Sequence, residues 1–302
     1  MLKLNTPLFL KGVFNFISNE NYQKEYIMKN NGLLFVLLSS VTFMSVQANA
    51  TLITFDGQLA SDGSGLTSQL IDSSNQLDLS SGFFIETFDA STQMTGFPFP
   101  PNQDTSYNYN NAATNNGGCG INTLGAPGIV ISETGGGLGV MKGSVSNVAA
   151  QPGGTDTTIG DTTCYGFTPK TGSSGTITVD YFNFLPQGVT LDYFGFYWGS
   201  VDTYNDFEFF LDNQSIFQIT GSTLLSELLG SSGNQNSTMS NTYVNIFFEN
   251  GESFNKFTVT SNGIAGEFDN VVVRSKIPEP MSLTIFALGL IGLAYRTKKH
   301  QL

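Results

Sequence analysis

The chain has 302 residues and a formal net charge of −12, and the segment from residue 51 to residue 276 holds 21 acidic residues against 5 basic ones. So acidic a segment repels the phosphates of nucleic acid and the headgroups of anionic lipids, which argues against nucleic acid as a partner. The single histidine is His300, so residues 51–276 lack the Ser-His and Cys-His pairs of common nucleophilic enzymes and the histidine ligands of most zinc and iron sites.

The first 50 residues predict an export signal that starts inside the sequence. Residues 1–27 are polar and mixed, and we expect them to be an artefact of start-site assignment. Residues 28–50 have the three parts of a signal peptide: a short basic start, an apolar core over 33–46, and small residues Ala48 and Ala50 at a cleavage site. The alternative is an uncleaved N-terminal membrane anchor.

Residues 51–276 are predicted to form one all-β body. Ile177, Val179 and Tyr181 alternate with polar residues, which is the period of a half-buried strand. Short strands separated by turns favour an antiparallel, jelly-roll-like β-sandwich. Further strands are expected over residues 53–56, 85–89, 189–198, 206–211, 216–219, 243–249, 254–261 and 266–274, and a short helix over 223–229 after Ser222.

Two turns and one covalent link are also predicted. Residues 212–215 have the chemistry of a hairpin turn, and the glycine-rich run 135–139 is expected to form a flexible hairpin. Cys119 and Cys164 are the two cysteines, and in an oxidising compartment we expect them to form a disulfide across the Gly- and Asn-rich middle of the body. The alternative is a pair of free thiols.

The segment from Phe194 to Asn205 resembles a motif of exosortase-dependent surface proteins, in which a strand ends in Trp-Gly-Ser and continues into Asp-x-Tyr-Asn. Further pieces similar to the same group are Ile219-Thr220-Gly221, Tyr243-Val244-Asn245 and residues 267–271. The resemblance implies a β-sandwich surface protein and no known activity.

Trp198 is the lone tryptophan and stands at the end of a predicted strand. One interpretation places it in the core or at its rim, with the indole N–H bonded to a backbone carbonyl. The other makes it a stacking platform for a sugar ring, with Tyr197 and Tyr204 as further contacts.

Asp202, Asn205 and Asp206 also have two interpretations. Asp202 and Asn205 either cap a tight turn through their own backbone, as Asp and Asn often do, or join Asp206 in supplying oxygen ligands to Ca²⁺, although the spacing is not that of an EF-hand. The pair Asp269-Asn270 is a second candidate for the same ion. No pair of carboxylates stands out as the acid and base of a glycosidase, and an enzyme would show itself by two carboxylates that converge in a pocket.

The last 26 residues, 277–302, have three parts in order. Pro278-Glu279-Pro280 comes first, and an uncharged apolar run of 15 residues follows from Met281 to Tyr295, against the ~20 that an upright membrane helix needs. A basic cluster, which would stay on the cytoplasmic side, closes the tail: Arg296, Lys298 and Lys299. This order resembles the PEP-CTERM sorting signal of Gram-negative bacteria; the alternative is an ordinary C-terminal membrane anchor.

That resemblance implies a route for the whole chain. The Sec machinery would export it, the tail would hold it in the inner membrane for a time, and an exosortase would process it at Pro278-Glu279-Pro280. We therefore expect a non-catalytic protein of the cell surface or extracellular matrix. The alternative function is that of a carbohydrate-binding module that binds extracellular polysaccharide.

Overall fold

The computed structural model describes residues 51–75, 82–89, 118–249 and 251–276, all of them within the second of two compact units, Asn49–Leu302. The first unit, Met1–Ala48, and the predicted signals with Ala50, Pro278-Glu279-Pro280, Arg296, Lys298 and Lys299 lie outside the described residues. Those features therefore stay predictions. No helix among the described residues is long and apolar enough to cross a membrane.

Every strand pair in the described part is antiparallel, as predicted. Seven of the described strands form the larger sheet, in the order β1 (Leu52–Thr54), β12 (Thr242–Phe247), β9 (Thr190–Gly199), β14 (Gly266–Lys276), β7 (Cys164–Thr168) and β6 (Gly139–Lys142), with β4 (Phe83–Glu86) also paired to β14. The second sheet has the order β11 (Gln214–Thr220), β10 (Asn205–Leu211), β13 (Lys256–Ser261), β8 (Gly175–Asp180) and β5 (Val130–Gly135). A two-stranded ribbon joins β2 (Gln58–Leu59) to β3 (Leu66–Thr67), η3 is a 3₁₀ turn at Thr123–Gly125, and α2 is the helix Gly221–Leu228.

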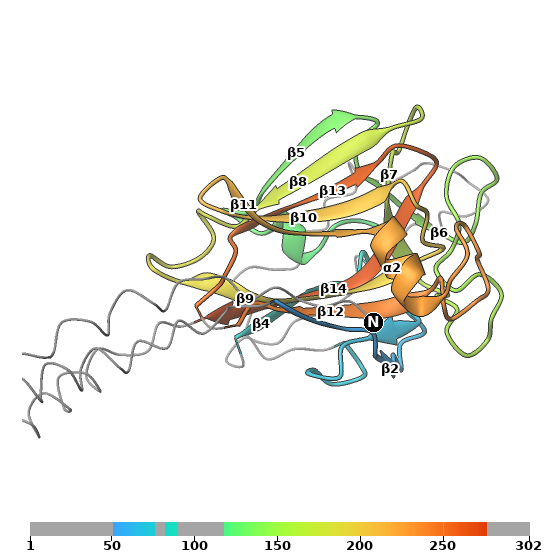
Figure 1. Cartoon of the computed structure of the whole chain (residues 1–302), viewed down its shortest axis with the longest axis horizontal. Coiled ribbons are helices and arrows are strands. Elements are labelled where there is room, and N and C mark those ends of the chain that lie inside the picture. The colour runs from blue at the N-terminus through green and yellow to red at the C-terminus, as the bar shows by residue number, and fades with distance from the viewer. Residues whose placement is uncertain (1–50, 76–81, 90–117, 250, 277–302) are drawn as a thin grey trace, which may run out of the picture. The chain divides into compact units, whose positions relative to one another are not determined.

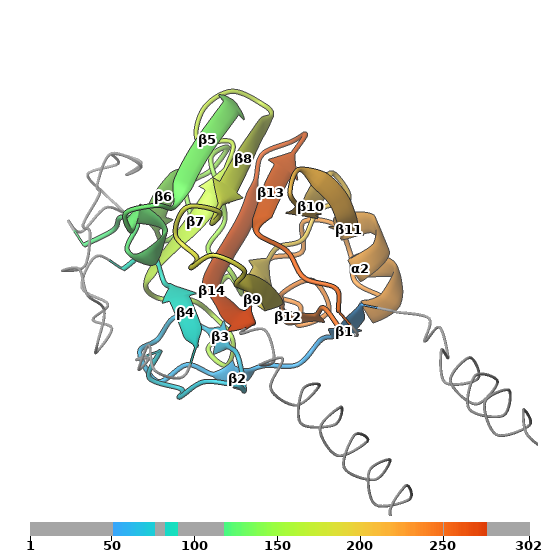
Figure 2. The ribbon, with the colours of Figure 1, turned by 90° about the vertical axis from the view of Figure 1, so that its left-hand side faces the viewer.

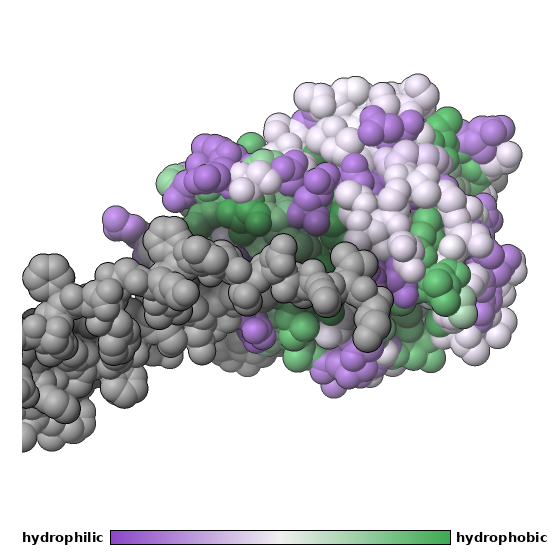
Figure 3. Space-filling model, in the orientation of Figure 1, coloured by the Kyte–Doolittle hydropathy of each residue, from purple (hydrophilic) through white to green (hydrophobic). Residues whose placement is uncertain are grey.

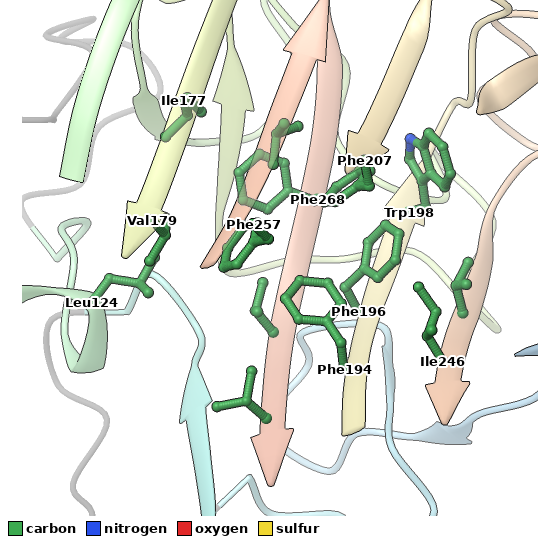
Figure 4. Close-up of a cluster of buried hydrophobic side chains, with 14 of the residues drawn as sticks. Leu124, Ile177, Val179, Phe194, Phe196, Trp198, Phe207, Ile246, Phe257 and Phe268 are labelled. Carbon is green, nitrogen blue, oxygen red and sulfur yellow. The ribbon is translucent and has the colours of Figure 1, made fainter. Parts of the chain in front are cut away.

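The two larger sheets lie over one another and share one aromatic core (Figure 1). Phe194 and Phe196 of β9 project toward the five-stranded sheet, where their ring centroids lie 4.7 Å from Phe257 and 4.1 Å from Phe207. Figure 4 shows these rings between the strands of the two sheets, beside Trp198. Face-to-face burial of large rings removes much apolar surface from water, and the edge-on ring pairs add to it.

Local sequence rules explain several elements. In β8 the burial alternates strictly, with Ile177 and Val179 buried, so the predicted strand period is confirmed. The hairpin between β10 and β11 turns on Asp212 and Asn213, whose φ values of 49° and 71° suit the two central residues of a type I′ turn. Helix α2 starts earlier than predicted, because the Thr220 side chain, and not that of Ser222, accepts the N–H of Thr223.

The glycine-rich run 135–139 does not form a hairpin, so that prediction was wrong. Gly135 ends β5 in the five-stranded sheet, and Gly139 begins β6 in the seven-stranded sheet. The run therefore carries the chain from one sheet to the other. Gly136 needs its lack of a side chain, since a Cβ there would lie 1.9 Å from the carbonyl oxygen of Thr171.

Cys119 and Cys164 form a disulfide, as predicted, with their Cα atoms 5.5 Å apart. Both residues are buried in the shared core. Asp89 touches both ends of this link, because its backbone bridges to Cys119 and its carboxylate accepts the N–H of Cys164 at 3.1 Å. The disulfide thus fastens the described segment that begins at residue 118 to the start of β7.

Strand β14 is the hub of the seven-stranded sheet, because it pairs with β9, β7 and β4. Phe268 faces the shared core, so alternation turns its neighbours Glu267 and Asp269 to the opposite, outer face. The β2–β3 ribbon lies on that outer side in both ribbon views (Figures 1 and 2). Two acidic residues of one strand are consequently buried outside the main core, at 2% and 0% exposure.

Candidate functional site

Two of the motif segments singled out in the sequence, residues 194–205 and residues 267–271, meet at a pocket of about 540 Å³. Its walls are the segment Ser144–Ala150 after β6, the Ser200–Tyr204 connection between β9 and β10, and the entry to β14 from Ile264 to Glu267. Gly233 and Gln235 complete the lining. We call this the Glu267 pocket. The face of the molecule in Figure 3 is largely polar, with apolar patches between the polar residues, as the Ser- and Asn-rich composition leads one to expect.

The connection from β9 to β10 is held by its own polar side chains. Ser200 leaves the strand with φ of 35°, and the Asn205 N–H closes a turn on the Asp202 carbonyl at 3.1 Å. The Tyr204 hydroxyl donates to Asp202 Oδ2 and the Ser232 hydroxyl donates to Asp202 Oδ1, both at 2.7 Å. Burial raises the pKa of Tyr204 above its usual range, so its hydroxyl keeps its proton at neutral pH.

Glu267 lies at the inner end of this pocket. Its Oε1 accepts the N–H of Ala150 at 2.8 Å, and its Oε2 accepts the hydroxyl of Ser200 at 2.7 Å. Burial raises the pKa of Glu267 to about 8, against an ordinary value of 4.5, and the hydrogen bonds from Ala150 and Ser200 oppose that rise only in part. The side chain is therefore mostly neutral at pH 7.

The pocket brings a neutral carboxyl and several hydroxyls together in one polar concavity. Such groups bind ligands that are themselves rich in hydroxyls, and the small apolar side chains of the lining, among them Val145, Val148 and Ile264, can contact the carbon atoms of such a ligand. Glu267 and Asp202 both line the pocket. Each of their four carboxylate oxygens already accepts a hydrogen bond from a protein donor. This arrangement suits binding of a polar ligand better than acid–base chemistry on it.

The predicted sugar platform is wrong in two of its three residues. Trp198 and Tyr197 are both fully buried, so no ligand can stack on them. The Trp198 ring packs on Phe196 and Phe207 at centroid distances of 5.3 and 5.0 Å. Its indole nitrogen meets no acceptor within the described part of the chain, so the predicted bond to a backbone carbonyl is wrong as well. Tyr204 remains a partly exposed residue of the pocket.

The predicted calcium ligands do not converge. The side chain of Asn205 is buried and accepts the Ser261 hydroxyl at 2.7 Å, whereas Asp206 projects from the other face of β10. Burial, and after it the charge of Glu208, raises the pKa of Asp206. Asp202 is occupied by Tyr204 and by Ser232, as described above. The turn-forming interpretation of Asp202 and Asn205 fits these contacts, through the backbone bond between them.

Sequence reasoning missed Glu267 and Ser200 as residues of a site, although both stood inside the motif segments. The signal for Glu267 was present: an acid at position 267 and another at position 269 alternate with apolar residues in a predicted strand. When acidic and apolar residues alternate along a strand, the acidic side chains are usually expected to face solvent. Here the segments that follow β6 and contain β2 and β3 cover that face, and such long-range coverage has no local sequence signal.

No family model, curated protein or solved structure matches the chain.

Proposed function

We propose that the chain is a non-catalytic, exported protein of the cell surface or extracellular matrix, processed by an exosortase in a Gram-negative bacterium. The observation that carries the proposal is the pair of signal-like segments, 28–50 and 277–302, around an acidic β body. The Cys119–Cys164 disulfide supports it, because such bonds persist in oxidising compartments outside the cytoplasm. The two stacked antiparallel sheets support a jelly-roll-like β-sandwich as the finer description of that body.

The test of this route is replacement of Pro278-Glu279-Pro280 by three alanines. The expected result is a full-length protein that stays in the inner membrane, found by fractionation and by antibody labelling of intact cells. A matched control replaces Pro98, Pro100 and Pro101, three residues of another proline-rich stretch, by alanine. Surface display of the Pro278-Glu279-Pro280 variant at the level of the parent would refute processing at that sequence.

The Glu267 pocket supports a second candidate function, binding of extracellular polysaccharide. Asp202 and Tyr204 place a carboxylate and a hydroxyl in the lining, with the Ser200 hydroxyl deeper against Glu267, and such groups recognise sugar hydroxyls. The full chain would be titrated with polysaccharide from the same cells. Tyr204→Phe and Asp202→Asn should weaken binding, and Phe182→Ala, a change at a side chain that is 63% exposed and outside this pocket, should not.

The same preparation tests the non-catalytic assignment. The parent protein should release no reducing sugar from that polysaccharide over hours. Release of sugar that Glu267→Gln abolishes, with binding retained, would instead make the pocket an active site.

A further inference from the structure

Two buried carboxylates on the outer side of the seven-stranded sheet have oxygens without partners. Asp161 and Asp269 are both 0% exposed. Oδ2 of Asp161 and both carboxylate oxygens of Asp269 accept no hydrogen bond within the described residues. Leaving an ionised oxygen buried and unpaired costs several kcal/mol, on the order of the total stability of many domains. If these oxygens are ionised, a stable fold therefore needs a positively charged or hydrogen-bonding partner for them besides the described residues.

Ser64, between β2 and β3, links the two chain segments that carry these aspartates. A bulge interrupts the β14–β9 pairing after Asp269, and Asn270 in this bulge has φ of 47°. Asn270 Nδ2 donates to the Ser64 carbonyl at 2.9 Å and to the Ser64 hydroxyl at 2.8 Å. The backbone of Ser64 in turn bridges to Asp161. One residue of the β2–β3 ribbon thus contacts both the neighbour of Asp269 and Asp161 itself.

The electrostatic surroundings are negative. Burial raises the pKa of Asp269, and the next largest causes are the charges of Asp161 and Asp89, while the nearby backbone N–H of Asn270, whose geometry falls short of a full hydrogen bond, opposes the rise. Burial likewise raises the pKa of Asp161 to about 7, with the charges of Asp89 and Asp62 acting in the same direction, while hydrogen bonds from Thr163 oppose the rise. Asp62 is exposed, so this cluster of four aspartates reaches the surface on one side.

We propose that Asp161 and Asp269 bind a divalent cation, Ca²⁺ in particular, on the outer side of the seven-stranded sheet, beneath the β2–β3 ribbon. Carboxylate oxygens are the ligands that Ca²⁺ prefers, and it completes its shell of 6–8 oxygens with backbone carbonyls and water. Those further ligands are needed, because no group of three or more His, Cys, Asp or Glu side chains in the described residues has the geometry of a metal site. The cation compensates the oxygens that the protein leaves unpaired.

Calcium also fits better than the other common divalent ions. Zinc and iron sites draw on imidazole and thiolate, and both cysteines are in the disulfide while the one histidine is His300, outside the described residues. Magnesium demands near-ideal octahedral geometry and gives up its water reluctantly, so it suits two buried carboxylates in an irregular setting less well.

The experiment uses the full chain, purified in mild detergent and freed of metal with EGTA. At pH 8, addition of 10 mM CaCl₂ is expected to raise Tm by about 5–10 °C, for a Kd of about 10⁻⁴ M and a body of this size. MgCl₂ at the same concentration should give a smaller shift. A second measurement is direct: Tb³⁺ should bind at the same place and luminesce through Tyr197, the residue opposite Asp269 in the β9–β14 pairing.

Three variants decide the assignment. Asp161→Asn and Asp269→Asn should lose the calcium shift and the Tb³⁺ signal, and Asp269→Asn should raise Tm in EGTA, because it removes a buried charge. A cooperative transition at that higher Tm shows that the Asp269→Asn variant is folded. Asp206→Asn is the matched control and should keep both the shift and the signal. At pH 5 the shift should shrink in the parent protein, since protons then compete for the same oxygens.

Two outcomes overturn the proposal. In the first, calcium changes neither Tm nor Tb³⁺ luminescence at pH 8, which means that the two carboxyls share a proton and hold no metal. In the second, both Asn variants keep the parent shift, which places the calcium elsewhere.

Discussion

The Cys119–Cys164 disulfide offers the prediction with the most direct magnitude. The change is Cys119→Ala together with Cys164→Ala. The bond joins residues 45 positions apart, and in the loop-entropy description a closed loop of that length removes about 4 kcal/mol of conformational freedom from the unfolded chain. In a body of this size, each kcal/mol corresponds to about 2–4 °C, so the variant should melt about 8–16 °C below the parent protein.

Thermal unfolding followed by circular dichroism measures this difference in the purified full chain. A second arm keeps the native cysteines and adds reductant. Because both sulfurs are buried, reduction should be slow in the folded protein and fast once the chain has been unfolded. The reduced, refolded protein should then melt close to the double variant. A decrease in Tm of less than about 2 °C in both arms would refute the reasoning, since other contacts would then hold residues 118–121 in place without the disulfide.

The remaining predictions concern buried groups. Trp198→Ala should lower the free energy of unfolding by about 3–5 kcal/mol in a denaturant titration, because the ring packs between Phe196 and Phe207. Tyr204→Phe at the pocket should lower it by less than about 1.5 kcal/mol. Equal losses in the two variants would contradict the buried position of the tryptophan. Tm in EGTA should fall as the pH rises from 5 to 8.5. Glu267 has a pKa of about 8 in the folded state and about 4.5 in the unfolded chain, so over this range the folded state binds a proton that the unfolded chain has released, and stability falls as the pH rises. Glu267→Gln should reduce that slope, and an unchanged slope would rule out this carboxyl as its source.

The sequence predicts those parts of the fold that depend on neighbouring residues. Alternation in residues 175–180 predicts a strand with one buried face, and Asp212-Asn213 predicts a turn because both residues tolerate a positive φ. The disulfide follows from the presence of two cysteines in a segment that we expect to be exported. In each case a few consecutive residues, or the number of residues of one type, contain the whole signal.

The features that the sequence does not predict depend on which distant segments come into contact. Residues 135–139 have the composition of a hairpin, but their flanking strands pair in different sheets, and nothing local distinguishes the two cases. For Trp198 the sequence favours the core over a surface platform, and its full burial against Phe207 bears that interpretation out, but the expected bond of its indole N–H depends on more distant segments. Asp269 has the pattern of a solvated acid but is fully buried, and the contact of its neighbour Asn270 with Ser64, 206 positions earlier in the chain, has no local signal.

The place of β14 has a consequence for the order of events during biosynthesis. This strand is the last one described in the chain, yet β9, β7 and β4 all pair with it. None of these three can complete its ladder until residues 266–276 have emerged from the ribosome or the translocation channel. Residues 51–265 therefore cannot close the seven-stranded sheet by themselves. A protease that cut ahead of Gly266 would leave three strands without their common neighbour.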